Sequence, residues 1–169
     1  MQVLLNKEQF RLTLTRMAHQ AVEQYDHLHD LVFIAIQPRG VFVGQKIAGI
    51  IQGLFPNEKI QYGVLDITFY RDDIRKELHT ANETHIPFSI ENKRVVLIDD
   101  VLYTGRTIRA ALDALQDFGR PRKVELCVLI DRRFKRELPI QADYFGRAID
   151  THDSQKVKVN PETEEVLLY

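Results

Sequence analysis

Two adjacent carboxylates, Asp99 and Asp100, stand between an apolar run and a loop of small residues in the sequence VVLIDDVLYTGRT, residues 95–107. Free backbone N–H groups at the start of a helix bind phosphate, and the Thr-Gly-x-Thr loop leads into such a helix. Carboxylates can hold sugar hydroxyls, a Mg²⁺ ion, or both. The segment therefore predicts a site for a phosphorylated sugar, with or without a metal ion.

The elements that must position this loop follow from the apolar pattern of the chain. Apolar segments predict strands alternating with helices, which is typical of an α/β fold with a mostly parallel sheet and helices on both faces. No linker interrupts the pattern, so we expect one domain over residues 1–169. The expected helices cover residues 7–27, 41–54 and 107–118, and the expected strands cover residues 31–36, 60–70, 94–100, 123–132, 157–159 and 165–169.

Polar clusters follow three of the expected strands, in the segments QPRG, DD and DRR, which begin at residues 37, 99 and 131. In open α/β sheets, ligands bind beyond the carboxyl ends of the strands. We therefore expect the three clusters to share one site. The polar stretch over residues 71–90 lacks a clear period and is too long for an idle connection, so it is either disordered or functional.

Composition excludes several classes of protein. The net charge of −1 provides no overall positive field for nucleic acid, so any RNA site must be local. No apolar run is long enough to span a bilayer, and the first residues do not resemble a signal peptide. The single cysteine, Cys127, lies in an apolar run and is expected to be a buried small residue. These features favour a cytoplasmic location.

The Walker pattern, the dinucleotide G-x-G-x-x-G motif, HExxH, paired CxxC and G-x-S-x-G are all absent from the sequence. What is present resembles the phosphoribosyl diphosphate (PRPP) signature of type I phosphoribosyltransferases. A Thr-capped helix start is the plainer alternative for this segment alone. The resemblance implies that Asp99, Asp100 and Arg39 act in catalysis, with the two acids holding the ribose hydroxyls directly or through Mg²⁺. It places around PRPP the residues Pro38, Arg39, Gly40, Asp99, Asp100, Val101, Leu102, Tyr103, Thr104, Gly105, Arg106 and Thr107.

Two further segments acquire roles from the same resemblance. The Pro38-Arg39-Gly40 turn corresponds to the loop that binds diphosphate, where a cis or strained peptide is expected. The polar stretch corresponds to a mobile loop that closes over PRPP and excludes water, with Arg71, Arg75 and Lys76 as candidates to reach the diphosphate. Without the resemblance, the first segment is a plain turn and the second is a solvated loop.

The segments DITFYRDD, LIDDVLYTGRTIRAALDAL, RELPIQADYFGRAI and TRMAH resemble one family over about residues 3–168: pyrimidine operon attenuation regulators that are also uracil phosphoribosyltransferases. The resemblance implies conversion of uracil and PRPP to UMP and diphosphate, with Mg²⁺. It also implies binding of a leader mRNA hairpin of pyrimidine genes, promoted by UMP or UTP, and assembly into a homodimer or higher oligomer. By position, Asp131, Arg132 and Val157 would border the base, and Thr15, Arg16 and His19 would contact RNA.

Two departures from the family pattern bear on the site. Pro38 replaces a threonine of many relatives, which removes a hydroxyl and an N–H from the diphosphate loop. The run of residues 132–136 is one residue longer than the usual turn. Two alternatives stay open: an RNA-binding attenuator with little enzymatic activity, and a purine phosphoribosyltransferase, which the LPI-x-ADY segment disfavours.

Overall fold

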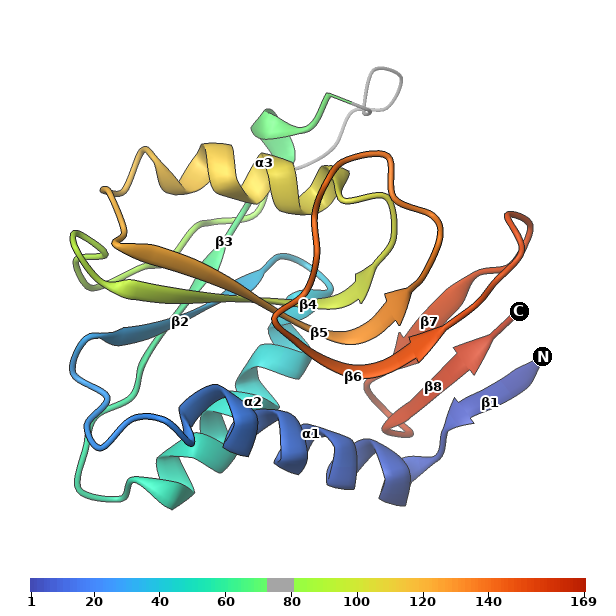
Figure 1. Cartoon of the computed structure of the whole chain (residues 1–169), viewed down its shortest axis with the longest axis horizontal. Helices are drawn as coiled ribbons and strands as arrows, with labels where there is room; N and C mark the ends of the chain where they lie inside the picture. Colours follow the sequence, from blue (N-terminus) through green and yellow to red (C-terminus); the bar gives the residue numbers. More distant parts are fainter. Residues whose placement is uncertain (73–80) are drawn as a thin grey trace.

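A five-stranded parallel sheet forms the centre of the molecule (Figure 1). The computed structural model describes residues 1–72 and 81–169, so Arg75 and Lys76 lie outside the described residues. The strands follow the order β3-β2-β4-β5-β6 across the sheet. Their bounds are β2 Leu31–Ile36, β3 Gln61–Leu65, β4 Arg94–Leu102, β5 Lys123–Arg132 and β6 Tyr144–Ile149.

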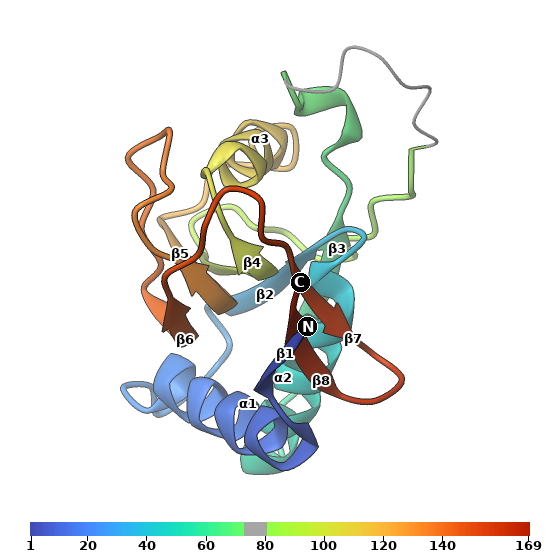
Figure 2. The ribbon, with the colours of Figure 1, turned by 90° about the vertical axis from the view of Figure 1, so that its right-hand side faces the viewer.

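Helices cover both faces of this sheet, which confirms the predicted fold class. α1 (Lys7–Val22) and α2 (Gly40–Leu54) lie on one face, and α3 (Arg106–Leu115) lies on the other (Figure 2). Alternate residues of the buried strands face the two layers, so Phe33 packs with α1 and α2 while Ile34 packs with α3. None of the helices in the described ranges is long and apolar enough to cross a membrane.

A small antiparallel sheet closes the molecule beside the central one. It consists of β1 (Gln2–Leu5), β8 (Glu165–Leu168) and β7 (Val157–Asn160) in that order. The two C-terminal strands were predicted, but β1 was not, because four residues give too short a pattern to read. Glu164 follows the turn of this hairpin and accepts hydrogen bonds from Arg11 on α1, at 3.0 Å, and from Lys46 on α2. The cap is thereby joined to both helices.

Several predicted boundaries are wrong. The first helix ends at Val22 rather than at residue 27, and Tyr25 instead accepts a hydrogen bond from the Arg94 guanidinium at 2.7 Å. The strand expected over residues 60–70 stops at Leu65, because the Asp66 carboxylate accepts a bond from the Thr68 hydroxyl and turns the chain into a short 3₁₀ helix, η1 Thr68–Tyr70.

β6 was missed because its sequence reads as part of a loop-rich segment. As the edge strand it is half exposed, so its apolar residues do not form a continuous run. Gly146 makes its position possible, since a Cβ atom there would lie 2.4 Å from the Leu129 carbonyl oxygen. Strand β6 thus packs closely against β5 through a residue without a side chain.

Cys127 is fully buried in β5, as the sequence predicted, and burial raises the pKa of its thiol to about 12. Because the thiolate is the reactive form, we expect native protein to react with a thiol reagent slower than denatured protein by a factor of roughly a hundred or more. A colorimetric titration with and without denaturant measures this. Rapid reaction of the native chain would show that β5 opens readily.

Candidate functional site

The acid pair lies at the centre of the sheet, near the carboxyl end of β4 between β2 and β5. Asp99 and Asp100 are 5% and 7% exposed, so both carboxylates are nearly removed from water. Strand β4 continues to Leu102, two residues beyond its expected end at residue 100, so both acids lie within the strand. Each uses one oxygen to accept the next backbone N–H, at 2.9 and 2.7 Å. A rigid strand thus holds the pair.

Burial sets the electrostatics of this pair. It raises the pKa of Asp99 well above its ordinary value, and the neighbouring Asp100 carboxylate adds to the rise. Burial also raises the pKa of Asp100, while the positive charge of Arg39 opposes the increase at both acids. Two buried like charges are costly without a counter-charge. The pair is therefore suited to bind cationic or hydroxyl-bearing ligands that relieve this cost.

The QPRG turn comes next to the acid pair at the start of α2. The Gln37–Pro38 peptide is cis, as the resemblance implied. A Cβ atom on Gly40 would lie 2.5 Å from the Ile98 carbonyl oxygen and 3.3 Å from the Asp99 Oδ1 atom. Glycine is therefore required for this turn to touch β4. Arg39 is exposed beside it, where its guanidinium can bind an anion above the acids.

The small-residue loop after β4 leads directly into the N-terminus of α3. Gly105 adopts φ +94° and precedes α3, whose first bond runs from the Arg109 N–H to the Gly105 carbonyl at 3.0 Å. A side chain there would also meet Ile140 at 3.0 Å. The Thr107 hydroxyl accepts a bond from Arg71 at 3.2 Å, so the start of the polar stretch lies against this loop. The site therefore combines a helix N-terminus with nearby cations.

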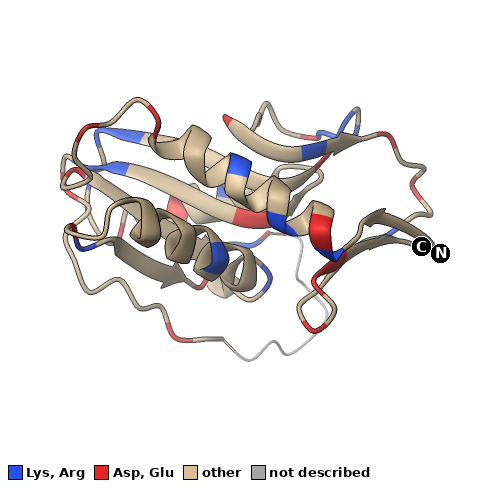
Figure 3. Ribbon diagram, turned by 90° about the horizontal axis from the view of Figure 1, so that it is seen from below, with Lys and Arg blue, Asp and Glu red and all other residues tan. Residues whose placement is uncertain are grey.

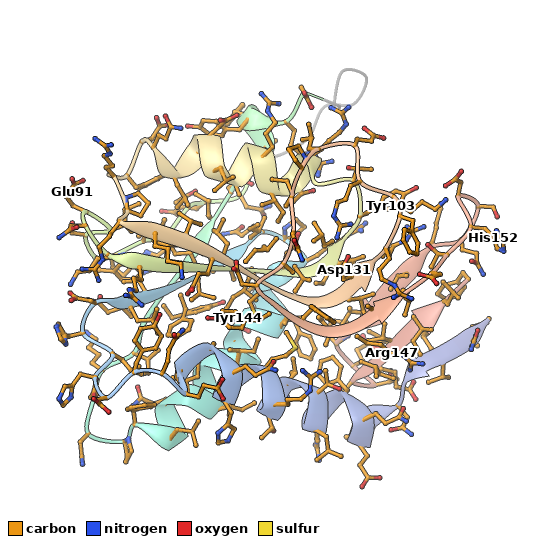
Figure 4. The ribbon with its side chains drawn as sticks, viewed as in Figure 1. Glu91, Tyr103, Asp131, Tyr144, Arg147 and His152 are labelled. Carbon is orange, nitrogen blue, oxygen red and sulfur yellow. The ribbon has the colours of Figure 1, made fainter. Side chains whose placement is uncertain are left out.

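The residues expected at the base lie at the same end of the sheet. Asp131 is paired across β4 and β5 with Leu102, and its carboxylate forms an ion pair with Arg136. Arg132 is 5% exposed, and its guanidinium lies 3.8 Å from the centre of the Tyr103 ring. Figure 4 shows Tyr103, Asp131 and His152 toward the end of the molecule opposite Glu91.

The donors of Arg132 bond the segment between β6 and β7. The guanidinium donates to the Thr151 hydroxyl at 2.9 Å and to the His152 and Gln155 carbonyls at 3.3 and 3.1 Å. Arg132 therefore holds the segment that leads to β7 against Tyr103 of the small-residue loop. Val157, at the start of β7, is half-buried against the core of α1 and α2.

Thr15, Arg16 and His19 all lie on the exposed side of α1, apart from the cluster around the acids. Arg16 donates to the Phe145 carbonyl on β6 at 3.3 Å and also to the Gly146 carbonyl. The Thr15 hydroxyl is bonded to the Arg11 carbonyl at 2.9 Å. Figure 3 shows basic residues along this helix, and its one acidic residue, Glu8, lies in the first turn. The face is positive only locally.

The sequence did not indicate which segment supports the small-residue loop after β4. The Thr104 carbonyl accepts bonds from the Glu137 and Leu138 N–H groups at 2.9 and 3.3 Å. Arg136 donates to the Tyr103 carbonyl at 2.6 Å. In the sequence, RELPI indicated only the family resemblance. An arginine beside a rigid Leu-Pro-Ile segment was the available signal, but its partner could not be read from the sequence.

A metal ion would need part of its coordination shell from a ligand. Within the described part of the chain, no three His, Cys, Asp or Glu side chains form a cluster that could hold a metal. The acid pair provides two neighbouring carboxylates, which is too few for a complete coordination shell. Mg²⁺ is often held in this way, by one or two carboxylates together with substrate phosphates and water.

The family model of the phosphoribosyl transferase domain matches residues 2–165. A "Bifunctional protein PyrR" from Pelotomaculum thermopropionicum is 46% identical over 158 residues, which cover 92% of this chain and 86% of the relative. The protein of the same name from Bacillus cereus is 44% identical over 164 residues, covering 94% of this chain and 89% of the relative.

Among solved structures, a hypoxanthine phosphoribosyltransferase from Staphylococcus aureus aligns with a TM-score of 0.70 and 24% identity, covering 89% of this chain and 79% of that chain. A hypoxanthine-guanine phosphoribosyltransferase from Bacillus anthracis aligns with a TM-score of 0.68 and 18% identity, covering 88% and 82%. At this level of identity, the likeness shows the fold alone.

Proposed function

Because the chain belongs to the phosphoribosyl transferase family and, within it, to the bifunctional PyrR proteins, we propose that it transfers the phosphoribosyl group of PRPP to uracil and regulates pyrimidine genes by binding their leader mRNA. The observation that carries the enzymatic half is one juxtaposition. A buried acid pair on β4 lies between an Arg-Gly turn and a helix-starting loop with a left-handed glycine. The acids are acceptors for the ribose hydroxyls of PRPP, and the two flanking segments carry donors for its 5-phosphate and its diphosphate.

The reaction requires positioning rather than a nucleophile. A uracil nitrogen forms a bond to the anomeric carbon of the ribose while the bond from that carbon to the diphosphate oxygen breaks. Diphosphate departs, and the proton of the attacking N–H is released. Asp99 and Asp100 hold the ribose hydroxyls and stabilise the positive charge that develops on the sugar. The Thr104–Thr107 loop fixes the 5-phosphate, and Arg39 binds the departing diphosphate.

Mg²⁺ fits the acid pair by the chemistry of its donors, because buried carboxylate oxygens with raised pKa values favour a hard cation. When bound with PRPP, the ion would neutralise diphosphate and make it a better leaving group. Asp99 and Asp100 are the residues that would hold it, through the ribose or through water. Arg71 would add a positive charge beside the loop of Thr104–Thr107, since its guanidinium donates to the Thr107 hydroxyl at 3.2 Å.

The choice of base is tested by initial rates with PRPP, Mg²⁺ and each of uracil, hypoxanthine, guanine, xanthine and orotate. We expect transfer to uracil to exceed transfer to every other base. The segment held by Arg132 and the Asp131 region would form the pocket that discriminates among them. Preferred transfer to a purine would replace this proposal with the purine alternative.

The regulatory half of the proposal concerns the exposed side of α1. Thr15, Arg16 and His19 lie there without contributing to the acid-pair site, so RNA and PRPP would bind different surfaces. UMP or UTP in the pocket would promote RNA binding. A homodimer would present two such helices, and a higher oligomer would present one for each subunit. The base-binding roles of Asp131 and Val157 belong to the same proposal.

Arg16→Ala is expected to weaken binding of a pyrimidine leader hairpin by roughly tenfold and to reduce its salt dependence, because a phosphate contact is lost. Transfer to uracil should be nearly unchanged. The matched control is Arg122→Ala. Arg122 is exposed and directly precedes β5, at the end of the sheet away from the acid pair. Since Arg16 also bonds β6, circular dichroism should accompany the filter-binding titration. Loss of both functions in a folded variant would contradict separate sites.

A further inference from the structure

Arg136 connects four groups that belong to three parts of the site. Its guanidinium donates to the backbone carbonyls of Tyr103, Ile140 and Arg132 at 2.6, 2.9 and 3.1 Å. It also forms an ion pair with the Asp131 carboxylate. The side chain is 22% exposed, whereas that of the nearby Arg133, which pairs with Asp150, is 51% exposed. Arg136 is thus built into the molecule rather than extended into solvent.

The bond to Tyr103 has a consequence for the phosphate loop. In a trans peptide the N–H points opposite to the C=O of the same unit. With the Tyr103 carbonyl held by Arg136, the N–H of Thr104 is directed to the other side of the chain. The Thr104 carbonyl is held in the same direction by the N–H groups of Glu137 and Leu138, which directs the Gly105 N–H likewise. Among the described residues, no backbone or side-chain acceptor bonds to either N–H.

We propose that Arg136 is a positioning residue for the phosphoribosyl donor: it fixes the Tyr103–Thr104 peptide so that two consecutive N–H groups face the 5-phosphate. This inference rests on the proposed function, since the anion concerned is the phosphate of PRPP. The Asp131 carboxylate holds the guanidinium at its other end. A planar fork with five donors can serve three carbonyls and a carboxylate together, which a lysine ammonium cannot do in the same geometry.

The inference predicts an effect on the donor that is separate from any effect on the base. For Arg136→Ala we expect the KM for PRPP to rise roughly 10- to 100-fold, the range for a lost charge-assisted hydrogen bond. The KM for uracil should change less than threefold. Arg136→Lys keeps the charge beside Asp131 but loses the fork, so it should resemble the alanine variant. Millimolar guanidinium should partly restore the KM of the alanine variant.

The control is Arg133→Ala. The sequence grouped Arg133 with the site, but in the structure its exposed side chain pairs with the exposed Asp150, so both KM values should stay unchanged. Unchanged affinity for PRPP in folded Arg136→Ala and Arg136→Lys would overturn the inference. Equal losses for both substrates, without rescue by guanidinium, would also overturn it and assign Arg136 to packing. If the alanine variant does not fold, the lysine variant carries the same comparison.

Calorimetric titration of PRPP separates this inference from the proposed function. If the wild type binds PRPP but transfers it to no base, the proposed function fails, and weaker binding by Arg136→Lys would still support the positioning role. If the wild type does not bind PRPP, both fail together. If wild type and variant bind PRPP equally, only the role of Arg136 fails.

Discussion

Asparagine in place of Asp100 is expected to lower kcat/KM for transfer to uracil by roughly 10²–10³-fold, the cost of removing one charged group that stabilises a transition state. The change keeps the shape of the side chain and removes its charge from a site that is only 7% exposed. The acid can therefore be neutralised without opening a cavity. Steady-state rates with PRPP, uracil and Mg²⁺ measure the effect.

The same substitution should stabilise the fold. Because burial raises the pKa of Asp100 in the folded chain, folding favours the protonated acid. Its contribution to stability is greatest below the ordinary carboxyl pKa, near 4, and is lost as pH rises through the raised value. Asp100→Asn should consequently have a higher melting temperature than the wild type at pH 7, and the difference should shrink at low pH.

Asp113→Asn is the matched control for this experiment. Asp113 lies on the exposed part of α3 and forms an ion pair with Arg109, one turn earlier on the helix. An exposed pair of this kind contributes little, so neither rate nor melting temperature should change appreciably. Full activity in Asp100→Asn would remove Asp100 from the catalytic proposal.

Gly40→Ala is expected to destabilise the protein by about 1–3 kcal/mol, the usual cost of forcing an extra group into a packed site. The added Cβ would lie 2.5 Å from the Ile98 carbonyl oxygen, and both groups belong to backbone that cannot move independently. The turn that carries Arg39 must then shift away from Asp99. A displacement near 1 Å can lower turnover roughly 10²-fold, so we expect a loss of that order.

Gly49→Ala provides a control on the same helix. A Cβ atom at Gly49 would meet nothing within 4 Å, so alanine should stabilise α2 by about 0.5–1 kcal/mol and leave activity unchanged. Chemical denaturation and steady-state kinetics on the two variants give the comparison. Wild-type kinetics in Gly40→Ala would show that contact between this turn and β4 is not needed for transfer.

The sequence predicted the parts of the fold that depend on continuous apolar runs. β2 and β5 have the predicted bounds, because six and ten residues of mostly buried strand leave a clear pattern. β1 and β6 were missed, since a four-residue strand and a half-exposed edge strand leave none. Their positions depend on partners far along the chain, such as β8 for β1.

In the candidate site too, the sequence predicted the features that depend on local residues and not those that depend on distant partners. Asp99, Asp100 and Gly105 could be found because local sequence sets their chemistry: two acids after a buried run, and a glycine before a helix. For Arg132, which was expected to border the base, the structure adds hydrogen bonds to Thr151 and Gln155, more than fifteen residues away. Contacts of this kind depend on tertiary packing, so no local pattern indicates them.

Product analysis of one reaction tests the central claim most directly. Wild-type protein is incubated with PRPP, Mg²⁺ and radiolabelled uracil, and the nucleotide and the diphosphate are quantified together. The account predicts UMP and diphosphate in equal amounts, formed only when all three reactants are present, and almost none with Asp100→Asn. Absence of UMP from the folded wild-type protein, or UMP formation at an equal rate by Asp100→Asn, would contradict it.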